Sequence, residues 1–240
     1  MTTKLKAANL NATYSADQFL KTSAAGALSW GAIAAGGGLA GVQSYTSTGS
    51  ATWTKSTRES ALGVTITKLI VHVQGAGGGS ADSSASTGVS GGAGGGYACK
   101  LIDVTNIDTC TVTVGAGTSG SAGGNSTFEK DTGTGTFLIV TGSGGSAGVA
   151  SVGGSSPVAG GAASNGDVEI PGGPGAGLNA NDGNQWGGDS FMGFGGRPLY
   201  TGDPRSQQGS GFGAGASGCG WSMGAGKAGN DGAIFVYEYQ

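Results

Sequence analysis

A segment in the last third of the chain combines aromatic rings with carboxylates and a guanidinium, the groups that proteins use to hold sugars. An aromatic ring can cover the apolar face of a sugar while the polar groups bond to its hydroxyls. Flanking polar residues and turns predict that Trp186, Tyr200 and Arg205 are exposed. The candidate binding residues are Trp186, Tyr200, Arg205, Asp182 and Asp189.

The opposite interpretation of the same segment is that its rings fill small cores between glycine runs, because large apolar side chains are usually buried. Phe191 and Phe194 fit that interpretation better than surface exposure. The pattern between Trp186 and Trp221 leaves both possibilities open for the remaining aromatic residues.

No residue pattern predicts catalysis, a metal site or a cofactor. His72 is the only histidine and lies within a predicted strand, with no partner that sequence can identify. Fourteen acidic residues offer no recognisable pair for glycoside hydrolysis. Residues 179–184 lack the spaced acids of a calcium loop. Residues 75–79 lack the lysine of a phosphate-binding loop. We therefore expect no enzyme activity.

Glycine dominates the composition, with 55 of 240 residues, whereas only 10% are charged. Five prolines and no triplet repeat exclude collagen, which needs glycine at every third position. No apolar run is long enough for a membrane helix. Residues 1–68 carry a net charge of +4 and residues 69–240 a net charge of −7, which together give −3. An acidic glycine-rich part makes nucleic acid an unexpected partner.

Runs rich in β-branched residues predict an all-β framework. They are Val64–Val73, Cys110–Val114, Phe137–Val140 and Ile234–Tyr239. Helical signals are sparse, and at most a turn or two is expected near Asp17–Leu20.

Glycine runs follow three of these strands directly, beginning at Gly75, Gly115 and Gly142. A flexible coil is one interpretation of such runs. The other is an ordered array of extended threefold helices, since glycine lets neighbouring backbones approach closely enough to bond laterally. Scarce charge and scattered aromatic residues favour the ordered array. The predicted fold is a glycine-rich, β-sandwich-like domain with polyglycine-II-like segments.

The sequence resembles bacteriophage tail-fibre and receptor-binding proteins with a glycine-rich domain. Gln18–Gly31 is similar to a phrase of tail proteins, G-Q-x-L-x-x-x-x-x-G-x-L-x-W, although Asp17 stands where glycine is usual. The other matching pieces are 51–55, 71–79, 91–97, 112–117, 123–128 and 226–239. Together they span most of the chain in a consistent order.

The resemblance implies a virion tail protein, usually a homotrimer, that displays a host-binding surface. Residues 1–45 would form a short extended segment for attachment to other tail or baseplate proteins and for trimerisation. Residues 46–240 would form the distal domain that binds a host glycan or outer-membrane component. The N-terminal sequence predicts no signal peptide, so we expect synthesis in the host cytoplasm. The attachment candidates are Leu5, Leu10, Phe19, Leu20 and Trp30.

Three alternatives stay open at this point. The chain could be a structural tail adaptor without host contact, with the Trp186–Trp221 segment buried against another protein. It could be a glycine-rich ice-binding protein, although the features that would favour this alternative, a signal peptide, an even number of cysteines and regular triplets, are not found in the sequence. An enzymatic spike is the third alternative.

Overall fold

The computed structural model describes residues 18–22, 28–32, 38–83, 88–135, 137–151, 155–177, 185–197, 206–219 and 225–240. It divides into two units, Met1–Gly38 with Gln240, and Leu39–Tyr239. The division precedes the boundary that we expected after Tyr45. The reason is that strand β3 (Leu39–Tyr45) pairs with the C-terminal strand β16 (Ala233–Tyr239) and so belongs to the second unit.

The first unit contains a hairpin of two antiparallel strands, β1 (Gln18–Thr22) and β2 (Leu28–Ala32). The attachment candidates Phe19 and Leu20 lie in β1, and Trp30 lies opposite Leu20 in β2. Leu5 and Leu10 lie outside the described residues. The helical turn expected near Asp17–Leu20 is wrong, because its described residues belong to β1.

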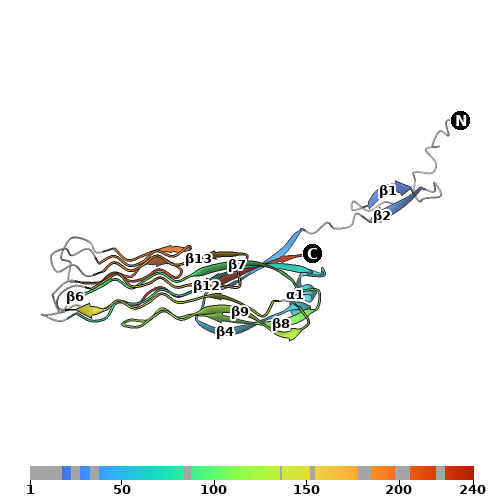
Figure 1. Cartoon of the computed structure of the whole chain (residues 1–240). Coiled ribbons are helices and arrows are strands. Elements are labelled where there is room, and N and C mark those ends of the chain that lie inside the picture. The colour runs from blue at the N-terminus through green and yellow to red at the C-terminus, as the bar shows by residue number, and fades with distance from the viewer. Residues whose placement is uncertain are drawn as a thin grey trace. The chain divides into compact units, whose positions relative to one another are not determined.

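The second unit contains a sandwich of two antiparallel five-stranded sheets, which confirms the all-β prediction (Figure 1). Sheet I has the order β13 (Val168–Ile170), β7 (Tyr97–Asp103), β5 (Lys68–Gln74), β16 and β3. Sheet II has the order β12 (Ala163–Ser164), β10 (Ile139–Gly142), β9 (Ser126–Gly133), β8 (Ile107–Val114) and β4 (Gly49–Thr54). The four predicted strand runs all contribute to these sheets, with bounds shifted by a few residues.

The core of the sandwich lies between the two sheets and follows the alternation of their strands. In β5, Leu69, Val71 and Val73 point inward and are fully buried. From sheet II, Val112 of β8 and Phe128 of β9 meet them in one buried cluster. Period-two alternation in the sequence therefore corresponds to one buried face per strand.

One short helix, α1 (Lys55–Leu62), follows β4 and was not predicted from the sequence. None of its residues is buried, and its sequence therefore lacks the periodic apolar residues by which a helix is usually recognised. The helix ends at Gly63, whose φ of 69° allows its amide to bond to the carbonyl of Glu59 at 2.8 Å. Arg58 ties the helix to the sandwich.

The Arg58 side chain reaches the carboxylate of Glu238, a fully buried residue of β16. Its Nε donates to Oε1 and its Nη2 to Oε2, both at 2.8 Å. The indole Nε1 of Trp53 donates to the same Oε1 at 2.9 Å. The buried carboxylate thus has a bidentate cationic partner and a third hydrogen-bond donor. These bonds replace the hydration that the carboxylate loses when it is buried.

The rest of the second unit is a bundle of extended glycine segments, called the glycine bundle below. Its segments run side by side from the sandwich to the end that carries the short strand β6 (Gly88–Val89) (Figure 1). The main ones are residues 75–80, 90–96, 142–148, 158–161, 172–177, 185–188, 213–219 and 226–232. Three further short strands, β11 (Ala150–Ser151), β14 (Gly193–Phe194) and β15 (Ser210–Gly211), belong to this part of the unit.

Segment 91–96 occupies the centre of the bundle and bonds to a different neighbour with each successive residue. The amides of Gly91, Gly92 and Ala93 donate to three different segments, and those of residues 94, 95 and 96 return to the same three in the same order. The acceptors are, in sequence, Ala176, Ala216, Ser146, Gly173, Gly213 and Ser143. Carbonyls of the segment accept from three further segments, through the amides of Gly75 and Gly78, Gly161, and Gly188. This period of three residues is that of polyglycine II.

Glycine is required here because neighbouring backbones occupy the space of a side chain. A Cβ atom on Gly95 would lie 2.1 Å from the carbonyl oxygen of Gly75, and one on Gly92 would lie 2.1 Å from that of Gly78. Such distances are far below van der Waals contact, and a backbone oxygen cannot rotate away as a side chain can.

Replacing Gly95 with alanine is expected to destabilise the unit by more than ~3 kcal/mol, since the clash can be relieved only by separating two bonded segments. Gly135→Ala is the matched control, because its new Cβ would meet only the flexible side chain of Ile107, at 3.0 Å. Urea unfolding of both variants measures the difference. Equal, small losses in the two variants would contradict the close-packed bundle.

Replacing Arg58 with alanine is expected to cost about 3–5 kcal/mol, because it leaves the buried Glu238 carboxylate without its counter-charge. Arg197→Ala is the matched control, since Arg197 pairs with the half-exposed Asp189 and its loss should cost at most ~1 kcal/mol. Thermal unfolding of both variants provides the comparison. A loss for Arg58→Ala no larger than the control would argue against a buried ion pair.

Candidate functional site

At the end of the glycine bundle remote from the sandwich lie the described residues that flank five intervals of the chain. Here Val89 donates to the carbonyl of Cys219 and pairs with Ala150 of β11. Gly218 donates to Gln185, and Ser217 donates to Gln207. Gly226 donates to the carboxylate of Asp82. The described residues that flank 84–87, 152–154, 178–184, 198–205 and 220–224 therefore lie together at this end.

Three of the five binding candidates belong to these intervening segments. Asp182 lies in 178–184, and Tyr200 and Arg205 lie in 198–205, so all three are outside the described residues. The bundle nevertheless fixes where their segments begin and end, because the flanking residues are bonded into it. The other two candidates, Trp186 and Asp189, are described.

Trp186 lies on the surface, as its polar neighbours predicted, with 48% of the residue exposed. The guanidinium of Arg197 lies over its ring, 5.0 Å from the centroid. Asp189 holds that guanidinium through contacts of 3.1 and 3.2 Å from Nη2, and its Oδ1 also accepts the amide of Gly195 at 2.7 Å. One face of the indole is thus paired with a cation.

Arg197 was missed as a site residue. The sequence places it eight residues after Asp189, but nothing in a glycine-rich stretch indicates that the chain reverses between them. The reversal is made by the turn at residues 191–192, which is closed by an antiparallel bridge in which the amide of Ser190 donates to the carbonyl of Gly193 at 2.9 Å. The cluster of Trp186, Asp189 and Arg197 offers an aromatic edge, carboxylate acceptors and guanidinium donors on one exposed surface.

The prediction that Phe191 and Phe194 are core residues is wrong, because the exposed fraction is 56% for Phe191 and 73% for Phe194. Phe191 lies in a tight turn and Phe194 in β14, whose pairing with β15 involves only two residues per strand, so both rings remain largely exposed. Phe191 stacks on Tyr97 with ring centroids 4.1 Å apart. Phe191 and Phe194 border a shallow hollow of about 440 Å³. Its other lining residues are Ser190, Met192, Gly193, Ser210 and Gly211.

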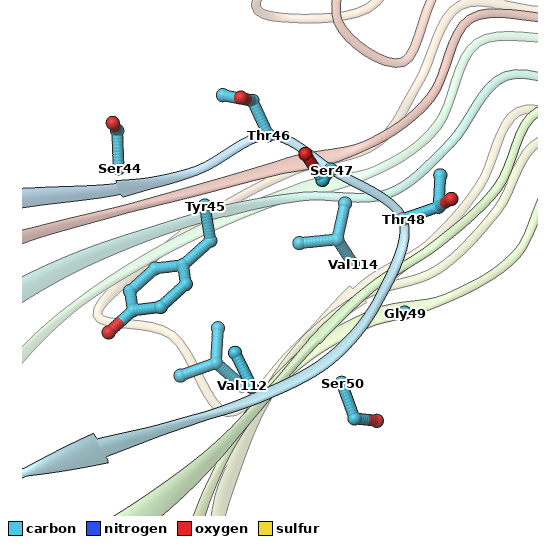
Figure 2. A pocket seen from close by; sticks show the side chains of 10 residues that line it. Ser44, Tyr45, Thr46, Ser47, Thr48, Gly49, Ser50, Val112 and Val114 are labelled. Atoms are coloured by element: carbon cyan, nitrogen blue, oxygen red, sulfur yellow. The ribbon is translucent and has the colours of Figure 1, made fainter.

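A second hollow, of about 270 Å³, opens under the turn between β3 and β4 (Figure 2). Figure 2 shows the ring of Tyr45 together with Val112 and Val114 on its inner side, whereas Ser44 and Thr46 point away. Burial raises the pKa of Tyr45, and the negative charge of Glu238 raises it further. The lining offers hydroxyl groups and apolar contact, but no carboxylate or basic side chain.

His72 lies on the outward face of β5, among aromatic rings. Its Nδ1 shares a hydrogen bond of 2.7 Å with the hydroxyl of Tyr97, and the ring of Tyr237 meets it edge-on at 5.2 Å. Burial lowers the pKa of His72 and raises that of Tyr97. The tyrosine hydroxyl is thus kept protonated and the imidazole neutral, an arrangement suited to packing.

Within the described part of the chain, no group of three or more His, Cys, Asp and Glu side chains could hold a metal ion. No helix among the described residues is long and apolar enough to cross a bilayer. No protein-family model matches the sequence, and no curated protein matches it.

The stability of the protein is expected to fall as the pH drops through the usual pKa of histidine, about 6.5. Burial lowers the pKa of His72 in the folded state, so the unfolded chain takes up the proton first and is favoured below that pH. The loss stops growing once the pH lies below the pKa of the folded state.

Because His72 is the only histidine, a His72→Gln variant should lose this slope. Unfolding free energies of both proteins, measured between about pH 7.5 and 5.5, test it. A parallel slope in the variant, or a gain in stability of the wild type on acidification, would contradict the environment described for His72.

Proposed function

We propose that this chain is a bacteriophage tail-fibre or receptor-binding protein. Its N-terminal segment attaches to the tail, and the remote end of its glycine bundle recognises a host-surface glycan or outer-membrane component. The observation that carries the proposal is the gathering of five segment ends at that remote end. The order of the tail-fibre-like sequence pieces is its second support.

The bundle suits recognition because it holds the flanks of those segments mainly through backbone hydrogen bonds. A binding segment can then change its residues without altering the scaffold, the usual relation between a functional loop and its support. Two of the segments carry Asp182, Tyr200 and Arg205. Their residue types resemble those of the described cluster of Trp186, Asp189 and Arg197.

A glycan is the favoured ligand class, because this end combines rings with charged hydrogen-bonding groups. The exposed part of the Trp186 ring can cover the apolar face of a sugar, beside the guanidinium of Arg197. Carboxylates and guanidinium groups form the strongest hydrogen bonds to neutral hydroxyls. Such binding needs no metal, cofactor or chemical reaction, and we propose that the protein is not an enzyme and does not bind nucleic acid.

The N-terminal hairpin suits attachment, because a two-stranded hairpin is at best marginally stable alone. We propose that β1 and β2 dock on another tail or baseplate protein, using the candidates Leu5, Leu10, Phe19, Leu20 and Trp30. The assembled virion protein would be an oligomer of identical chains, with a homotrimer expected from the resemblance.

The test is binding of the purified full chain to an array of bacterial surface polysaccharides and to a panel of whole bacteria. The wild type should bind a limited set of them. A Tyr200→Ala, Arg205→Ala double variant and a Trp186→Ala variant should each bind at least ~10-fold more weakly, since aromatic and arginine contacts dominate recognition surfaces.

Leu138→Ala is the control, because this exposed residue lies beside β10 in the sandwich. It should leave binding unchanged. Absence of binding to every polysaccharide and every strain, or binding that both end variants retain in full, would contradict the proposed recognition site and favour a structural adaptor.

A further inference from the structure

The outward face of sheet I carries apolar side chains in rows that run across the strands. The register places Leu101, Ile70, Tyr237 and Val42 opposite one another on β7, β5, β16 and β3. These residues alternate with the buried ones, such as Leu69 and Val236, and therefore point away from the core.

The next row continues the same surface. Val168, Cys99, His72 and Phe235 are adjacent across β13, β7, β5 and β16. Tyr97 extends it toward the bundle, where Phe191 stacks on its ring. We call the two rows together with Tyr97 and Phe191 the outer apolar face.

The borders of this face are open to solvent in the single chain, whereas Tyr97 is only 3% exposed and stacks against the Phe191 ring. Val42, Leu101 and Val168, which mark its borders, are 45%, 53% and 49% exposed. Exposed apolar surface of this extent, in continuous rows, is typical of a surface that another molecule covers.

The absence of net charge on the face favours a partner surface that is also uncharged, such as the same face of a second copy. Neither row contains an acidic side chain, a lysine or an arginine, and burial keeps the His72 pKa low. The charged groups at its border are paired, because Lys68 lies directly opposite Asp103 and Lys100 forms an ion pair of 3.2 Å with Asp167, so the border is neutral as a whole. A strongly charged partner gains nothing from such a face, whereas two copies can meet without repulsion between like charges.

The size of the face fits a weak contact between copies, smaller than a standard interface. The four seven-residue strands, about 4.8 Å apart and about 3.3 Å long per residue, give sheet I an outward footprint of roughly 450 Å², of which the two rows occupy about half. The corrugation of the side chains and the Phe191 ring enlarge the accessible area. A standard interface needs about 800 Å² on each partner.

We infer that the outer apolar face is the surface through which copies of this chain associate. The inference specifies a contact surface for the oligomer in the proposed function, but it does not depend on host binding. Association would bury the rows of Leu101 and Val168 and leave the remote end of the glycine bundle free.

Sedimentation and light scattering of the full chain over a series of concentrations test the inference. The wild type should form a species whose mass is a multiple of 22.8 kDa. A Val42→Glu, Leu101→Glu double variant should raise the dissociation constant by about 100-fold or more, because identical charges would meet at the contact. Both positions are exposed in the single chain, so the variant should keep the circular dichroism spectrum and melting temperature of the wild type.

Leu138→Glu is the matched control, because it places the same charge on an exposed leucine outside sheet I and should leave the mass unchanged. Cys99 gives a second measurement, since Cys110 and Cys219 are buried. Maleimide should label Cys99 more slowly in the associated wild type than in the double variant.

A wild type that stays monomeric throughout, or an oligomer that the double variant does not weaken, would overturn the inference. These outcomes are independent of the polysaccharide-binding assay, so failure of the contact surface and failure of the proposed recognition site are distinguishable.

Discussion

Lateral hydrogen bonding between extended glycine segments is the interaction on which the second unit depends. Segment 91–96 forms hydrogen bonds with six neighbouring segments, and each successive amide donates to a different neighbour with a period of three residues. This geometry requires backbones so close that a Cβ on Gly95 would reach within 2.1 Å of a carbonyl oxygen. The bundle therefore replaces the burial of large side chains by mutual satisfaction of amides and carbonyls, which otherwise would be costly to bury. The sandwich supplies the apolar core that orders the first residues of these segments.

The same constraint separates scaffold from variable surface. Inside the bundle, the buried positions are mainly glycine, alanine and serine, which leave few side chains for recognition. Functional groups must therefore lie at the ends of the segments or on the outside of the bundle, where Trp186, Asp189 and Arg197 are found. The sandwich, in contrast, has an outward face whose rows include Leu101 and Val168. We assign recognition to the end of the bundle and association to the sandwich, so the two proposed functions use different surfaces.

Much of the framework could be predicted from the sequence, because alternation in a strand such as β5 records directly which side is buried. The ordered glycine segments were also favoured, since scarce charge and interspersed rings do not suit a flexible coil. Their neighbours could not be predicted, because one Gly-small-Gly run resembles another and the pairing depends on the whole bundle. Phe191 and Phe194 were misplaced because hydrophobicity does not reveal whether a second layer exists to cover a ring. Arg197 was missed because its contact with Trp186 requires a chain reversal that glycine does not signal.

Hydrogen–deuterium exchange at single-residue resolution tests the central claim most directly, since it reports whether the amides of the glycine bundle are bonded in solution. The account predicts that the amides of Gly92, Ala93 and Gly94 exchange as slowly as those of Val71 and Val73 in β5, because both sets are buried and hydrogen-bonded. Exchange of the glycine amides at the rate of an unstructured peptide, with protection confined to the sandwich, would contradict it. The segments would then be a coil, without a rigid end on which binding residues could be placed.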